Sequence, residues 1–177
     1  MNSFSQTLSD IKGDLLGKNN SFKVFLVSYL YSPRFRLLLN YRLGKYFFKS
    51  NNSLIRQLGN YYKARMVVKR GCDISYNSII GKNFKMPHPI GVVIGDGVVI
   101  KDNVMVFQQV TFGSHGKKGK KLEYPTIENG VKIYAGAKII GGVTVGENAV
   151  IGTNTVVNIN VPPNSIAVGI PCKILKK

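Results

Sequence analysis

The sequence predicts a mainly β protein, a solenoid of short parallel strands that follows a shorter helical region. The main observation is a ladder of apolar residues at every sixth position, a period that neither a helix nor an ordinary strand has. Glycine, asparagine and aspartate fill much of the space between, and they tolerate the left-handed dihedrals of tight corners. The ladder consists of Ile94, Ile100, Val106, Phe112, Ile127, Ile133, Ile139, Val145, Ile151 and Val157, and it is preceded at the same spacing by Ile74, Ile80 and Met86.

A solenoid explains this period because one residue on each side points inward and stacks on its copy in the next coil. Three hexads would then complete one triangular coil. The alternative is a set of antiparallel strands with glycine-rich turns.

Two interruptions of the ladder are candidate functional sites. The first widens the spacing to eight residues and holds Pro87-His88-Pro89, and the second holds the glycine- and lysine-rich segment 113–121. Insertions in a solenoid leave the core as loops on one face, which is often the binding face. Both histidines of the chain, His88 and His115, lie at these interruptions.

Length and charge predict two parts, a helical cap over residues 1–70 and a solenoid domain with a C-terminal tail over residues 71–177. The net charge is +17 over 177 residues, and residues 1–70 hold thirteen Lys or Arg and two Asp, a net charge of +11. Such a surface suits an anionic membrane, an acidic polymer or a phosphorylated cofactor. The sequence has no nucleic-acid recognition motif, so we expect no nucleic-acid partner.

Cysteine usage and the absence of a cleavable signal predict a cytoplasmic protein. Cys72 and Cys172 are far apart, so we expect unpaired thiols and no metal site. The apolar run 24–31 is too short to span a bilayer. Peripheral contact with the inner face of the cytoplasmic membrane is the alternative location.

The N-terminal region has helical spacing over about residues 3–60. Pro33 separates two helices, and Ser32 is the expected N-cap of the second. Basic and aromatic residues interleave over residues 34–49, which indicates a cap with a solvated basic face or, alternatively, an interfacial helix on anionic lipid. We expect extended structure over residues 61–68, and a short last strand over residues 166–168.

His88 is the main candidate for catalysis. A neutral imidazole can take the proton of an acceptor hydroxyl as the oxygen attacks a thioester, and can then return it to the thiolate. Its position in an insertion lets the side chain leave the coil.

Four segments together carry a family resemblance: residues 87–95, 108–113, 161–163 and 169–173. They resemble the serine O-acetyltransferase family of hexapeptide acyltransferases, most closely its branch of capsule, O-antigen and exopolysaccharide O-acetyltransferases. The resemblance covers residues 71–176, and residues 32–43 look like the short helical leader of that branch. It implies a left-handed parallel β-helix, acetyl-CoA as donor and a homotrimer with the cofactor between adjacent subunits.

The resemblance also assigns roles residue by residue. His88 matches the catalytic base, and Asp73 matches the carboxylate that orients it; Asp73 could instead be a turn residue that caps the first coil. Ser114, after Gly113, matches the main-chain N–H that holds the thioester oxygen. Ala135 and Thr153 match positions along the pantetheine arm, which could equally be simple coil packing. Independently of the resemblance, Lys138 and Lys173, with the four lysines of segment 113–121, could neutralise the phosphates of coenzyme A and complete the expected cofactor-binding set; for most of these lysines a solvated mobile loop is the alternative.

Three positions depart from true serine acetyltransferases. Pro87 replaces an Asp before the histidine, and Glu123 and Tyr124 replace an Arg-His pair. Glu123 would repel an amino-acid carboxylate, whereas glutamate and tyrosine suit a sugar, with Gln108 as a further acceptor residue. We therefore expect acetylation of a cell-surface polysaccharide or its precursor; the alternatives are serine O-acetylation for cysteine biosynthesis and a non-catalytic membrane scaffold.

Overall fold

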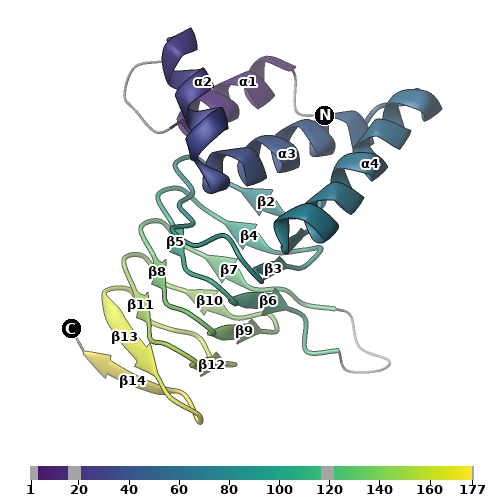
Figure 1. Ribbon diagram of the computed structural model, residues 1–177. Coiled ribbons are helices and arrows are strands. Elements are labelled where there is room, and N and C mark those ends of the chain that lie inside the picture. Colours follow the sequence, from purple (N-terminus) through teal and green to yellow (C-terminus); the bar gives the residue numbers. More distant parts are fainter. Residues whose placement is uncertain (1–3, 16–20, 117–121, 177) are drawn as a thin grey trace. The chain divides into compact units, whose positions relative to one another are not determined.

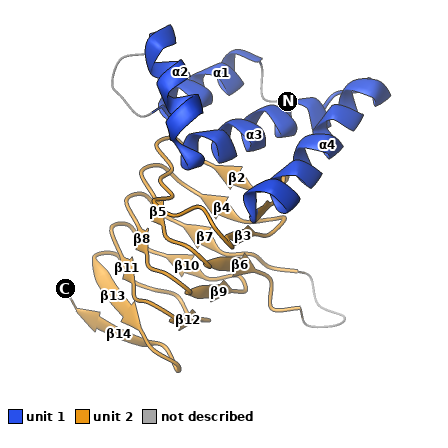
Figure 2. Cartoon of the chain, in the orientation of Figure 1, with its two compact units in different colours: residues 1–72 blue, residues 73–177 orange. Residues whose placement is uncertain are grey.

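The computed structural model describes residues 4–15, 21–116 and 122–176. The chain forms two compact units, Met1–Cys72 and Asp73–Lys177 (Figure 2). The first unit is helical and the second is built of strands, and each has its own core.

The helical unit contains four helices, labelled in Figure 1: α1 (Phe4–Gly13), α2 (Phe22–Tyr31), α3 (Pro33–Phe48) and α4 (Ser53–Arg70). Ser32 ends α2 and is the N-cap of α3, where its hydroxyl oxygen accepts from the Phe35 N–H at 3.1 Å. Pro33 occupies the first turn, in which its missing N–H costs no hydrogen bond. The predicted break between two helices is thus confirmed.

The prediction of extended structure over residues 61–68 is wrong, because these residues lie within α4. Their tyrosines and valines favour strands only weakly, and packing against α3 overrides that preference. Asn40 of α3 donates to the Tyr62 carbonyl at 2.7 Å. Gly59 lets the helices approach, since a Cβ there would lie 2.6 Å from Phe48 Cα.

A buried ion cluster joins α1 to α3. Arg42 Nε donates to Asp14 Oδ2 at 3.2 Å, and Arg42 Nη1 lies 3.5 Å from Asp10 Oδ2. The Arg42 side chain is only 5% exposed. The expected solvated basic face is therefore wrong for Arg42, whose charge is held inside the unit by two carboxylates.

The second unit is a parallel β-helix whose strands form three faces (Figure 1). Face A contains β1 (Asp73–Ile74), β3 (Val93–Ile94), β6 (Thr111–Gly113), β9 (Lys138–Ile140) and β12 (Val156–Val157). Face B contains β2 (Ile79–Ile80), β4 (Val99–Ile100), β7 (Thr126–Ile127) and β10 (Thr144–Val145). Face C contains β5 (Met105–Val106), β8 (Lys132–Ile133), β11 (Val150–Ile151), β13 (Ser165–Val168) and β14 (Lys173–Lys176).

The ladder residues form the core of this unit. Every ladder residue from Ile94 to Val157 is at most 1% exposed. Ladder residues also pair in register, as Ile94 does with Phe112 and Phe112 with Ile139. Asparagines occupy left-handed corners, for example Asn154 at φ 55°. The predicted left-handed parallel β-helix with a short helical region is confirmed.

The C-terminal tail adds a strand that the sequence did not predict. β13 covers the expected last strand, and β14 then pairs with it antiparallel. Residues 173–176, expected to trail along the solenoid, therefore close face C. Within the described ranges, no helix has the length and apolarity needed to cross a membrane.

Candidate active site

Four of the predicted site residues lie along one corner of the solenoid. The corner consists of the connections that lead from face C to face A, and we call it the C-to-A corner: residues 86–92, 107–110, 134–137 and 152–155. In the first of these coils, face C is represented by Lys85, which forms a parallel bridge with Met105 of β5. Backbone hydrogen bonds tie these connections together: Gln109 N to Ile90 O at 2.9 Å, Gly136 N to Gln108 O at 3.0 Å and Asn154 N to Ala135 O at 2.9 Å. Successive connections therefore carry His88, Gln108, Ala135 and Thr153.

His88 is exposed at this corner. Its carbonyl accepts from the Ile90 N–H at 2.9 Å, which fixes the turn between the two prolines and the strand. The imidazole lies 6.3 Å from the Phe107 ring, measured between centroids, and Phe107 stacks on Tyr134 at 5.1 Å. An exposed imidazole beside an apolar aromatic surface can exchange a proton with a bound hydroxyl.

The aromatic pair Phe107 and Tyr134 was not among the predicted site residues. Each follows a ladder residue directly, Val106 and Ile133 respectively, so the same position in two coils carries a ring. That repetition was a usable signal in the sequence. Together the rings give the corner a flat apolar surface next to His88.

Asp73 lies in β1 on face A, paired with Val93 of the next coil. Val93 follows the connection that contains His88, so the two predicted catalytic residues belong to adjacent coils. The Asp73 side chain is exposed, which differs from the buried carboxylate that orients histidine in known triads. Orientation of His88 by Asp73 stays a prediction.

The remaining acceptor residues lie at the opposite edge of face A, in the long connection from β6 to β7. A Cβ on Gly142 would lie 3.0 Å from Glu123 Oε2, and one on Gly97 would lie 2.5 Å from Tyr124 Cδ2. Both side chains therefore pack against glycine corners that lead from face A to face B. Glu123 Oε2 also lies 3.9 Å from His115 Nε2, within ion-pair distance when the histidine is protonated.

Gly113 ends β6 and Ser114 begins the same connection. Within one chain, the predicted oxyanion donor and the C-to-A corner therefore lie at opposite edges of face A. The lysines expected to meet phosphates, Lys117, Lys118, Lys120 and Lys121, lie outside the described residues.

Two further lysines were predicted to meet the cofactor. Lys138 Nζ donates to the Gln109 carbonyl at 2.7 Å and to Thr111 Oγ1 at 3.3 Å, which places its charge beside the C-to-A corner. Lys173 is exposed on β14, opposite Val168. Only Lys138 is thus tied to the corner of His88 by hydrogen bonds of the described residues.

Gln108 has an unsatisfied acceptor at the same corner. Its Oε1 atom is buried and has no hydrogen-bond partner in the described part of the chain. A buried amide oxygen of this kind gains free energy from a ligand that donates a hydrogen bond.

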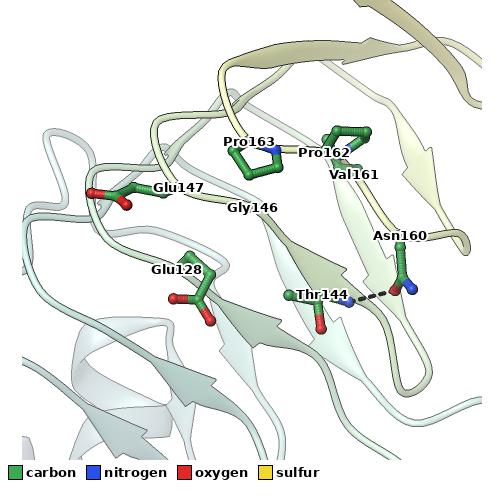
Figure 3. A pocket seen from close by; sticks show the side chains of 8 residues that line it. All are labelled: Glu128, Thr144, Gly146, Glu147, Asn160, Val161, Pro162 and Pro163. Carbon is green, nitrogen blue, oxygen red and sulfur yellow. Dashed lines mark hydrogen bonds between the residues drawn. The ribbon is translucent and has the colours of Figure 1, made fainter.

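A hollow of about 450 Å³ lies elsewhere, over face B (Figure 3). Its lining includes Glu128, Thr144 and Glu147. Glu128 pairs with Lys101 at 2.6 Å, but no basic residue of the described part of the chain lines the hollow itself. Two carboxylates would repel the phosphates of a nucleotide cofactor, so the C-to-A corner is the better candidate site.

Comparisons with known proteins identify the relatives of this chain. The family model for bacterial transferase hexapeptide (six repeats) matches residues 124–158. The serine acetyltransferase of Buchnera aphidicola subsp. Schizaphis graminum is 37% identical over 155 residues, which are 88% of this chain and 58% of that protein. The chain thus spans less than two thirds of the length of this curated relative.

Two solved structures agree with this relationship. Soybean serine acetyltransferase complexed with serine has a TM-score of 0.78 and 30% identity, covering 97% of this chain and 68% of that chain. The Brucella abortus enzyme in complex with coenzyme A has a TM-score of 0.79 and 29% identity, covering 97% and 66%. These relatives favour the serine alternative over the polysaccharide branch. The chain belongs to the hexapeptide-repeat transferases and is a homologue of the serine acetyltransferases.

Proposed function

We propose that this chain transfers an acetyl group from acetyl-CoA to the hydroxyl of L-serine. The observation that carries the proposal is the likeness, over 97% of the chain, to a serine acetyltransferase that was solved with serine bound. The coenzyme A complex of another relative supports the donor. The exposed His88 at the C-to-A corner supplies the group that this reaction needs.

His88 acts as general base in this proposal. Its neutral imidazole takes the hydroxyl proton while the oxygen attacks the thioester carbonyl. The tetrahedral intermediate then collapses, the carbon–sulfur bond breaks, and the imidazolium returns the proton to the thiolate. The products are the O-acetyl ester and free coenzyme A, with no net change in protons. Asp73 would orient the imidazole and the Ser114 N–H would hold the developing oxyanion.

We also propose that the active enzyme is a homotrimer. The predicted residues occupy two opposite edges of face A, with His88 and Gln108 at one edge and Glu123 and Tyr124 at the other. A three-fold assembly of three-sided solenoids can bring one edge against the other edge of a neighbour. Acetyl-CoA would then lie between subunits, along Ala135 and Thr153, with Lys138 near its phosphates.

A saccharide hydroxyl is the second candidate acceptor, and one observation favours it. Pro87, Glu123 and Tyr124 replace the residues with which true serine acetyltransferases hold an amino acid. The Glu123 side chain is 65% exposed, so its charge is available to a ligand and would repel a carboxylate. A capsule or O-antigen unit, polymeric or lipid-linked, has the hydroxyls that these side chains can bind.

The test is thiol release from acetyl-CoA by purified protein, with L-serine and a panel of capsule and O-antigen oligosaccharides as acceptors. We expect release with serine, and the His88→Ala variant should lose a factor of about 10² to 10⁴ in turnover while it still binds acetyl-CoA. Release with a saccharide alone would replace serine by the second candidate. Binding of acetyl-CoA without turnover on any acceptor would favour a scaffold.

A further inference from the structure

Three arginines of the helical unit lie close together. Arg36 belongs to α3, and Arg65 and Arg70 belong to α4. Burial lowers the pKa of Arg70, and the positive charges of Arg65 and Arg36 lower it further. Tyr29 of α2 has the opposite effect. Gly59 packs against Phe48, and Asn40 donates to the Tyr62 carbonyl, so α4 runs antiparallel to α3. Arg36, one turn before Asn40, therefore lies beside the last turns of α4, which carry Arg65 and Arg70. The three guanidinium groups are near enough to repel one another.

This cluster has no acidic partner within its unit. Residues 1–72 contain only two acidic residues, Asp10 and Asp14, and both pair with Arg42. The Nε atoms of Arg36, Arg65 and Arg70 are all buried, and none has a hydrogen-bond partner in the described part of the chain. Like charges and unsatisfied buried donors both destabilise a fold, and an anion that accepts these hydrogen bonds would relieve both effects.

The chemistry of the donors selects the class of anion. A guanidinium presents its N–H groups in a planar fork that matches the oxygens of phosphate, and three forks suit an anion with several oxygens and more than one charge. We propose that Arg36, Arg65 and Arg70 form a binding site for a phosphate group, carried by a lipid headgroup or by a soluble phosphorylated molecule. This site stands apart from the proposed acetyl transfer and does not depend on it.

The face of α4 around Arg65 favours a lipid headgroup over a soluble molecule as the carrier of the phosphate. Leu54, Leu58, Tyr61 and Val68 follow the same helical spacing as Arg65, at intervals of four and three residues, and all four are exposed. Leu54 and Val68 are 79% and 81% exposed. An arginine within an exposed apolar and aromatic stripe is typical of helices that lie on an anionic lipid surface. A soluble phosphate would need only the arginines.

The experiment compares two charge-matched triple variants of the full chain. One replaces the cluster, Arg36→Gln, Arg65→Gln and Arg70→Gln; the other removes three exposed charges of the same unit, Lys23→Gln, Lys49→Gln and Arg56→Gln. The lipid probe is sedimentation with phosphatidylcholine vesicles, with and without phosphatidylglycerol. The soluble probes are inorganic phosphate and pyrophosphate, followed by calorimetry.

We expect the cluster variant to lose at least about tenfold in affinity for the phosphate-bearing probe that binds, and the control variant to lose much less. Binding to phosphatidylglycerol vesicles alone identifies a headgroup, and binding to the soluble anions alone identifies a phosphorylated molecule. Equal losses in both variants would mean non-specific attraction and would overturn the site, as would the absence of binding to every probe.

The single variant Arg65→Lys guards against a folding defect. It keeps the charge and loses the planar fork, so we expect weaker phosphate binding with an unchanged circular dichroism spectrum. Unchanged binding by this folded variant would also overturn the proposal.

Discussion

Replacing Arg42 by Met tests whether the buried ion cluster holds the helical unit together. Arg42 and Asp14 have side chains that are 5% and 1% exposed, so the substitution leaves the Asp14 carboxylate buried without its partner. Burial already raises the pKa of Asp14, and Arg42 is the largest opposing influence. Breaking a buried pair by removing one partner typically costs about 3–5 kcal/mol. We expect a loss of that size in the free energy of unfolding at pH 7.

The loss should shrink as the pH falls. A carboxyl whose folded pKa lies above its unfolded value binds its proton more tightly in the folded state, so its unfavourable effect is full at neutral pH. The effect disappears as pH falls through the raised pKa towards 3.8, the ordinary pKa of an aspartate. In Arg42→Met the pKa of Asp14 should rise further, because the opposing charge is gone.

Urea unfolding followed by circular dichroism at pH 7 and at pH 5 measures both effects. Arg56→Met is the control, since Arg56 is exposed and its loss should cost less than about 0.5 kcal/mol. A deficit for Arg42→Met below about 1 kcal/mol, or one that is equal at both pH values, would refute the reasoning.

Further variants probe other contacts. Burial lowers the pKa of Lys45 to about 8 from 10.5, so wild-type stability should rise between these pH values by about 1–2 kcal/mol after allowance for solvent, and Lys45→Met should flatten that rise in urea unfolding. Gly59→Ala should lose about 1–3 kcal/mol because its Cβ meets the Phe48 backbone, whereas Gly13→Ala, with nothing within 4 Å, should be neutral; equal melting points would contradict this. Phe107→Ala should lower kcat/KM up to about tenfold, and unchanged kinetics would remove the aromatic surface from the site. Glu123→Gln should raise the KM for serine severalfold with kcat nearly unchanged, and a lowered KM would show that this carboxylate repels the acceptor.

The solenoid was predictable because the six-residue period of apolar residues follows directly from the geometry of its coils. An apolar residue such as Ile133 is found at every sixth position because each side of a coil needs one inward side chain. This pattern can be recognised without knowing which residues far along the chain pack together. The same reasoning assigns corners: His88, Gln108, Ala135 and Thr153 each fall in the connection before a strand of face A. Their common edge therefore follows from counting along the chain.

The helical unit was harder to predict because its structure depends on contacts between helices. Residues 61–68 contain tyrosines and valines, and only their packing on α3 explains why they are helical. Likewise, the sequence contains thirteen basic residues up to Arg70, and nothing in it indicates that Arg42 is buried and paired with two aspartates. Sequence spacing also does not indicate that Arg36 lies near Arg65 and Arg70, because Arg36 belongs to α3 and the other two belong to α4.

The charge of Glu123 can favour or oppose serine as the acceptor, depending on which group of serine it meets. Repulsion of a carboxylate counts against serine, but serine is a zwitterion, and its ammonium group would be attracted by the same side chain. The departure at Pro87 removes an acidic residue next to His88. In the proposed trimer, Glu123 of a neighbouring subunit could replace that lost negative charge, because one edge of face A would meet the other edge of a neighbour. His115, 3.9 Å from Glu123, would weaken that charge only when protonated. Glu123 therefore does not by itself exclude serine, and the substitutions that suggested a sugar are compatible with an amino acid held in a rearranged pocket.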